Sequence, residues 1–209
     1  MTAAPADAQL WGFPDHAVPS AFGTPSRFVA GTYGRYDFTR TADLLNAYAL
    51  TVGGTGLGER VSVTAGVGVI GDGESEWTLG GSVGVDVLEA DATTQVSLQG
   101  GVGWLTVDVF TEAVTSLRFP IGVALKRRID VESVSVTPWV MPRVNIIRKS
   151  LAGRSATEMD LGVSAGVGVT MASGFGAHAA LDVLAANSAI WALGVGAHYV
   201  IRLGVRRRR

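Results

Sequence analysis

The stretch "VSVTAGVGV", residues 61–69, alternates apolar residues with small ones almost without a break. Close copies recur along the chain as "VSAGVGV" at 163–169, "GSVGV" at 81–85 and "GVGA" at 194–197. A period of two residues is the signal of a β-strand with two different faces. The fold therefore depends on which environment accepts one face of valine and an opposite face of Gly, Ser and Thr.

The same period runs through most of the chain. It begins near residue 27, after a segment interrupted by Pro5, Pro14, Pro19 and Pro25, and separators such as "GDGES", "EADAT" and "AANS" carry turn residues. No amphipathic helix pattern competes with it. The pattern predicts ten strands, near 27–39, 44–54, 60–70, 76–88, 94–110, 116–127, 134–145, 157–171, 174–184 and 189–203.

The glycine-rich faces decide between water and lipid. In a water-soluble sandwich the valine face would be the core, and the water-facing positions would carry mainly Lys, Glu, Arg and Thr. Here they carry Gly, which weakens an exposed strand and packs against nothing. If the valines face lipid instead, the small residues line a narrow lumen, and a closed barrel leaves no unpaired backbone in hydrocarbon. Strands of this length also suit a tilted crossing of a bilayer.

Aromatic residues support the membrane interpretation. When the strands are threaded up and down, aromatic side chains of the apolar face fall at the two rims, as expected of girdles at the membrane boundaries. The predicted girdle residues are Phe28, Phe38, Trp77, Phe110, Phe175, Trp191 and Tyr199.

With its alternation, girdles and even strand count, the chain resembles the outer membrane β-barrel proteins of Gram-negative bacteria. The last strand, "GVGAHYVIRL", also resembles the C-terminal assembly signal of that class, although the chain continues to "GVRRRR" where those proteins commonly end on an aromatic residue. The resemblance covers residues 27–203 and implies a location in the outer membrane, with the lipid bilayer as the first partner.

The predicted fold class is all-β: a closed, antiparallel, up-and-down transmembrane β-barrel of ten strands, with eight as the alternative count. The predicted organisation is an irregular N-terminal segment at 1–26, periplasmic or plugging the lumen, the barrel at 27–205 and a basic tail at 206–209. Within the barrel, Pro120, Pro138 and Pro142 predict bulges or irregular pairing, because proline removes a ladder donor. A basic loop is expected near 146–157, with lipopolysaccharide as its candidate partner.

Composition narrows the function. A net charge of -1 and no basic stripe argue against nucleic acid as a partner, and the absence of cysteine excludes disulfides and thiolate metal sites. Two matches to G-x-S-x-G, at 80–84 and 162–166, lie in strands with no helix after them, so they do not predict a hydrolase elbow. No metal ion or cofactor is expected.

Polar residues on the small-residue face are the candidate lumen lining. Acidic and basic groups both occur among them, and buried charges of opposite sign are expected to pair. The predicted lumen-lining residues are Tyr33, Arg35, Asp86, Asp108, Arg118, Asp160, His178, Asp182 and His198.

These residues leave several functions open. The main prediction is a small structural or pore-forming barrel without catalysis, which would pass small solutes if its lumen is open. One alternative is an outer membrane hydrolase that uses His178, Asp182 and His198 of the last hairpin as a general-base group. Another is an interaction subunit of an envelope assembly.

Overall fold

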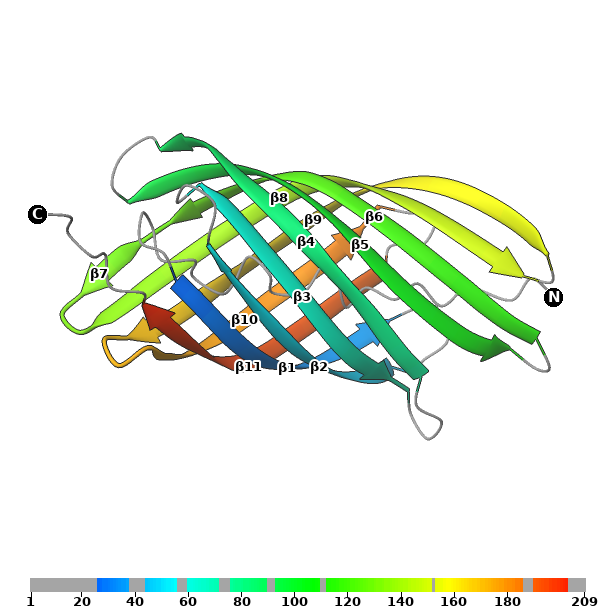
Figure 1. The fold of residues 1–209 in the computed structure, drawn as a ribbon, viewed down its shortest axis with the longest axis horizontal. Helices are drawn as coiled ribbons and strands as arrows, with labels where there is room; N and C mark the ends of the chain where they lie inside the picture. The colour runs from blue at the N-terminus through cyan, green and yellow to red at the C-terminus, as the bar shows by residue number, and fades with distance from the viewer. Residues whose placement is uncertain are drawn as a thin grey trace, which may run out of the picture.

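The computed structural model describes residues 26–37, 44–55, 60–71, 76–89, 93–109, 112–151, 153–185 and 190–202, and all regular structure in them is β-strand. The strands run obliquely around one long axis (Figure 1). Their bounds are β1 Ser26–Asp37, β2 Leu44–Thr55, β3 Val61–Ile70, β4 Glu76–Glu89, β5 Thr94–Val109, β6 Glu112–Arg127, β7 Ile129–Val131, β8 Val134–Leu151, β9 Arg154–Met171, β10 Phe175–Leu184 and β11 Ile190–Arg202.

Every neighbouring pair of strands is antiparallel, and the sheet closes on itself. Strand β1 pairs with both β2 and β11, and β6 pairs with both β5 and β8. The three-residue strand β7 continues β6 beyond Arg128 and pairs with β8. Counted with β7 as part of β6, the barrel wall consists of ten strands, which are called staves below. The prediction of a closed, ten-stranded, up-and-down barrel is confirmed. The rim where β1 begins and β11 ends is called the terminal rim below, and the opposite rim is called the distal rim.

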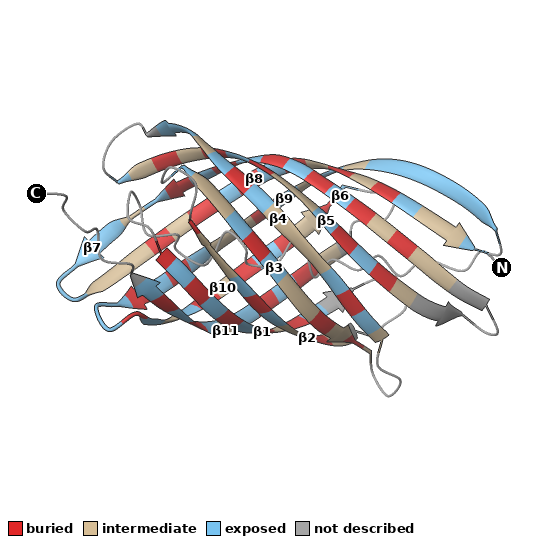
Figure 2. Ribbon diagram, viewed as in Figure 1, coloured by how far each residue is buried: buried red, intermediate tan, exposed pale blue. Residues whose placement is uncertain are grey.

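Burial alternates along the strands, which gives the barrel two distinct faces (Figure 2). The outer face is apolar even though its side chains are open: Trp77 is 62% exposed, Leu161 65% and Leu50 53%. An apolar surface that continues around a whole barrel would be unfavourable in water and suits lipid. Among the described residues, no helix is long and apolar enough to cross a membrane.

The hairpin of β8 and β9 corrects one sequence expectation. The basic segment 146–157 was predicted to be a loop, but it lies in paired strand on both sides of the turn near Gly153. The register runs through Ile147↔Glu158, and Lys149 Nζ lies 2.9 Å from Glu158 Oε2 on the partner strand. Residues 154–159 are exposed without alternation, so this hairpin extends beyond the distal rim (Figure 2). Ladder hydrogen bonds and this cross-strand ion pair outweigh the turn-forming residues of the segment.

The prolines interrupt the ladders on both sides of β6. Pairing of β5 with β6 stops at Gly100↔Ile121 and resumes at Gly103↔Arg118, on either side of Pro120. Pairing of β6 with β8 stops at Gly122↔Arg143 and resumes at Leu125↔Val140, beside Pro142. The expected irregular pairing is present at Pro120 and Pro142, but the register is unchanged across each gap, so neither gap is a bulge. Pro138 pairs with Val167 in a β8–β9 ladder that has no interruption. The missing N–H of proline accounts for the lost pairs.

Strand β1 faces the opposite way from the prediction. Phe28 was expected on the outer face, yet it is 7% exposed and lies inside with Ala30 and Val200. Tyr33 and Arg35 were expected inside, yet Tyr33 pairs with Tyr48, which is 60% exposed, and Arg35 is itself exposed. Both faces of this strand mix polar with apolar residues, so its own pattern does not show which face points into the lumen. The neighbouring strand determines the facing, because the Phe28 ring occupies the space above Gly53, where an added Cβ would lie 2.7 Å from ring carbons.

Candidate functional site in the barrel lumen

An apolar cluster fills part of the lumen. Its buried members come from strands all around the barrel, so side chains meet across the interior. Trp139 is 4% exposed and Leu105 1%, which leaves little accessible surface at their level. The members are Ala47, Ile70, Leu105, Ala124, Trp139, Met141, Ala180 and Ala192.

A charged group, called the arginine cluster here, consists of Arg118, Arg143, Asn145, Ser164 and Asp182. Asp182 Oδ1 accepts hydrogen bonds from Arg143 Nη2 and, at 3.0 Å, from Ser164 Oγ. Arg118 donates to Asn145 Oδ1 through Nε at 2.9 Å and Nη2 at 2.7 Å, and its Nη2 lies 3.9 Å from Asp182 Oδ2. The cluster therefore joins four adjacent staves, β6, β8, β9 and β10, with every member at most 4% exposed.

The cluster places one carboxylate between two guanidinium groups. Its buried polar atoms include some without a hydrogen-bond partner in the protein: the donors Arg143 Nε and Asn145 Nδ2 and the acceptor Asp182 Oδ2. A mixture of unused donors and acceptors suits bridging water, which can both donate and accept. The arrangement supports a hydrated polar network rather than a dedicated anion site.

The second lumen group, called the histidine pair here, is His178 with His198, placed nearer the terminal rim. Both are buried, at 4% and 3% exposed, and their Nδ1 atoms are 3.3 Å apart. His178 Nε2 lies 3.1 Å from Thr32 Oγ1, and His198 Nε2 lies 2.9 Å from Thr170 Oγ1. The imidazole rings stack with centroids 5.6 Å apart. The two histidines that the hydrolase alternative groups in the last hairpin are therefore close neighbours.

Asp182 is not part of the histidine pair. It lies four residues further along β10, which is roughly 13 Å of extended strand. Its carboxylate bonds to Arg143 and Ser164, whereas the imidazoles bond to each other and to threonines. The His/Asp grouping of the hydrolase alternative is thus separated into two different networks.

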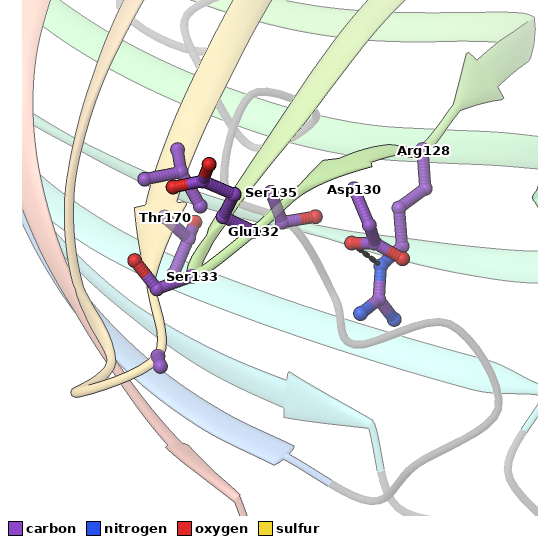
Figure 3. A pocket seen from close by; sticks show the side chains of 8 residues that line it. Arg128, Asp130, Glu132, Ser133, Ser135 and Thr170 are labelled. Carbon is purple, nitrogen blue, oxygen red and sulfur yellow. Dashed lines mark hydrogen bonds and ion pairs between the residues drawn. The ribbon is translucent and has the colours of Figure 1, made fainter.

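A polar pocket of about 300 Å³ lies at the terminal rim (Figure 3). It is formed by the β7–β8 turn and the end of β9, and Glu132 at that turn has a positive φ of 53°. The ion pair between Arg128 and Asp130, with Nε and Oδ1 2.7 Å apart, forms one side. Thr170 lines the other side, so the pocket adjoins the histidine pair.

No family model matches the chain, and no curated protein matches it in sequence. Solved structures do match. The β domain of the Bordetella autotransporter BrkA is 14% identical, with a TM-score of 0.50 over 85% of this chain and 100% of that one. Neisserial surface protein A is 10% identical, with a TM-score of 0.46 over 86% and 97%. The N-terminal barrel domain of Pseudomonas aeruginosa OprF is 13% identical, with a TM-score of 0.40 over 84% and 97%.

This chain has the outer membrane β-barrel fold. The class recognised in the sequence is confirmed at the level of the fold. Solved structures of this fold include the outer membrane enzyme PagL and the outer membrane protease OmpT of Escherichia coli as well as the Yersinia pestis attachment protein Ail. A fold by itself does not select a function.

Most of the predicted lumen residues with described side chains lie on the interior face of this outer membrane β-barrel. Arg118, His178, Asp182 and His198 are buried there. Asp86 and Asp160 are half-buried and pair in register with buried Ser97 and Asn145. Asp86 also interacts electrostatically with the buried Lys126. Tyr33 and Arg35 are the exceptions described above, and the Asp108 side chain lies outside the described residues.

The predicted girdle residues are divided between the two rims of the outer membrane β-barrel. Phe175 is 61% exposed at the terminal rim and packs against Tyr199, with ring centroids 4.9 Å apart. Trp77 is exposed near the distal rim, and Trp191 lies on the outer face there. Phe28 is inside, and the side chains of Phe38 and Phe110 lie outside the described residues. The girdle role itself stays a prediction.

Several lumen residues escaped sequence reasoning. Arg143 and Asn145 follow Pro142 in β8 and were not among the predicted lumen residues, and Ser164 was interpreted only as a small residue. Thr32 was assigned to the outer face with the rest of the misassigned β1. Ser164 and Thr170 alternate with the outward valines of β9, so their even-numbered positions alone could have placed them in the lumen. The predicted plug at residues 1–26 and the tail at 206–209 lie outside the described residues, except for Ser26.

Proposed function

We propose that this protein is a structural barrel of a Gram-negative outer membrane, without catalysis, whose lumen is closed to free diffusion of solutes. The observation that carries the proposal is the arginine cluster, where two guanidinium groups and one carboxylate are buried and bonded across four staves. An open aqueous channel would expose such charges to water. The apolar cluster supports closure at a second level of the lumen.

Single-channel recording in a planar bilayer tests the proposal. The refolded chain should insert and remain silent, because the arginine cluster and the apolar cluster both fill the lumen. Asp182→Asn removes the central charge of the arginine cluster but leaves the apolar cluster in place, so this variant should also stay silent, as should Glu158→Gln on the protruding hairpin. Steady conductance steps from the wild-type chain would instead support the passive-pore alternative.

Support for the hydrolase alternative is weaker. The Asp182 carboxylate is committed to Arg143 and Ser164, so it does not orient an imidazole as a general-base group requires. We infer that His178 and His198 have no role in hydrolysis. Loss of a measured lipid or peptide hydrolysis in His198→Ala, with folding intact, would contradict this inference.

The protruding β8–β9 hairpin supports a finer proposal about partners. Arg148, Lys149 and Arg154 lie on its exposed or half-exposed part, and lipopolysaccharide carries the phosphate groups that such residues bind. We therefore propose lipopolysaccharide as a contact of this hairpin. Replacing these three residues with alanine should weaken the binding of labelled lipopolysaccharide to the refolded barrel, and unchanged binding would refute the proposal.

A further inference from the structure

The histidine pair rests on a repeated tripeptide. The sequence Gly-Ala-His occurs at 176–178 in β10 and again at 196–198 in β11. Because these strands are antiparallel, the register places Gly176 opposite His198, Ala177 opposite Ala197 and His178 opposite Gly196. Each histidine thus lies across from the glycine of the other copy, in a locally two-fold arrangement.

The two glycines make the histidine arrangement possible. A Cβ on Gly196 would lie 2.5 Å from His178 Nε2, and a Cβ on Gly176 would collide with His198 Nε2. With glycine at both places, each imidazole fits over the glycine of the neighbouring strand, and the two Nδ1 atoms lie 3.3 Å apart. The rings are consequently fixed by the backbone as well as by their hydrogen bonds.

The geometry points to a binding site for a transition-metal ion of the Zn²⁺, Ni²⁺ or Cu²⁺ class, held by Nδ1 of His178 and Nδ1 of His198. Two nitrogen ligands at roughly 2.0–2.1 Å from a tetrahedral zinc ion lie about 3.3–3.4 Å apart. The two Nδ1 atoms are 3.3 Å apart. The pair therefore matches one edge of the coordination tetrahedron.

The threonines supply the outer support that metal-bound histidines usually have. In the metal-bound state each Nε2–H donates to a threonine hydroxyl, Thr32 for His178 and Thr170 for His198. Both Nδ1 lone pairs then face the metal, which replaces the hydrogen bond between the two Nδ1 atoms. The donors are imidazoles without a carboxylate in their hydrogen-bonded network, which favours the borderline transition metals over Ca²⁺ or Mg²⁺. No described group of three or more His, Cys, Asp or Glu side chains is placed to hold a metal, so water would complete the coordination.

The rim pocket provides an approach to the site. Thr170 lines that pocket of about 300 Å³ and also bonds to His198 Nε2. A hydrated ion entering from the terminal rim would therefore reach the histidine pair without passing the arginine cluster. The inference does not depend on whether the lumen conducts.

Isothermal titration of the refolded full-length chain with ZnCl₂, in a buffer free of phosphate, tests the site. The chain has three histidines and no cysteine, so each imidazole can be removed singly. We expect one saturable Zn²⁺ site that is lost in His178→Ala and in His198→Ala and kept in His16→Ala. Titration with CaCl₂ should give no saturable heat. A wild-type chain that binds no Zn²⁺, or binding that survives either lumen variant, overturns the proposal.

A second variant keeps both imidazoles and changes only a hydroxyl group that supports one of them. Thr170→Val removes the hydroxyl partner of His198 Nε2 and should weaken Zn²⁺ binding about tenfold. Thr51→Val, another buried lumen threonine, is the matched control and should bind as the wild type does. Circular dichroism confirms that each variant is folded. Equal affinity in Thr170→Val and Thr51→Val would contradict the assigned geometry.

Discussion

At the scale of single residues, the lumen depends most on Asp182. Its carboxylate is the one anionic member of the arginine cluster, and both arginines in that cluster are buried. Buried ion pairs add little net stability when intact, but removing one partner leaves an uncompensated charge. The sequence predicted a lumen position for Arg118 and Asp182 and expected inward charges to pair, yet it gave no means of finding the second arginine partner, Arg143.

Asp182→Ala should therefore lower the free energy of unfolding by about 3–5 kcal/mol. Urea unfolding of the chain in lipid vesicles, followed by tryptophan fluorescence, measures the change. Glu158→Ala is the control, because its ion pair with Lys149 is on the surface and should contribute about 0–1 kcal/mol. Equal losses in the two variants would show that the buried network is not held by its charge balance.

At the scale of strands, the sequence predicted nearly every element because the outward valines and inward small residues repeat without interruption in β3, β4 and β9. It was wrong on the facing of β1, where neither face is clearly apolar. It was also wrong on 146–157, where Ser150, Gly153 and Ser155 suggested a loop although the segment pairs as strand. Both errors have one cause. The facing of β1 and the pairing of 146–157 depend on residues of the neighbouring strands, which the sequence of one strand does not reveal.

The facing of β1 can be measured with nitroxide labels in the cysteine-free chain. A label at Tyr33→Cys should be relaxed strongly by oxygen dissolved in the bilayer, because Tyr33 lies on the outer face beside Tyr48. A label at Thr32→Cys, one residue away, should be protected, because Thr32 lies inside against His178. The reverse pattern would restore the facing expected from the sequence.

At the scale of the whole molecule, the barrel is closed by the pairing of its first and last strands. Ser26 opposes Arg202 at one end of this seam and Asp37 opposes Trp191 at the other, so the seam is continuous. A closed seam satisfies the backbone hydrogen bonds that an open edge would expose to lipid. The sequence indicated closure only because an open edge would be unfavourable in lipid, since no motif marks β1 and β11 as partners.

A cysteine pair tests the seam. Val29→Cys with Tyr199→Cys joins residues that are direct partners in the register, and it should form a disulfide on mild oxidation. The chain has no native cysteine to compete. Val29→Cys with Val200→Cys is offset by one residue, so its side chains point to opposite faces and should not cross-link. Equal cross-linking of both pairs would argue against a fixed seam, and gel mobility after denaturation distinguishes the products.

The interrupted ladders beside Pro120 and Pro142 have a mechanical consequence. Both gaps border the same stave, β6, one at its residues 119–120 and the other at its residues 123–124. Resistance of a sheet to shearing is shared among its ladder hydrogen bonds, so β6 is weakened locally at these two gaps, although its ladders as a whole are longer than those of β3 or β10. When the barrel is pulled from the bilayer by its ends, the strands should not yield uniformly. Within β6, separation from its neighbours should begin beside Pro120 and Pro142, where ladder pairs are missing.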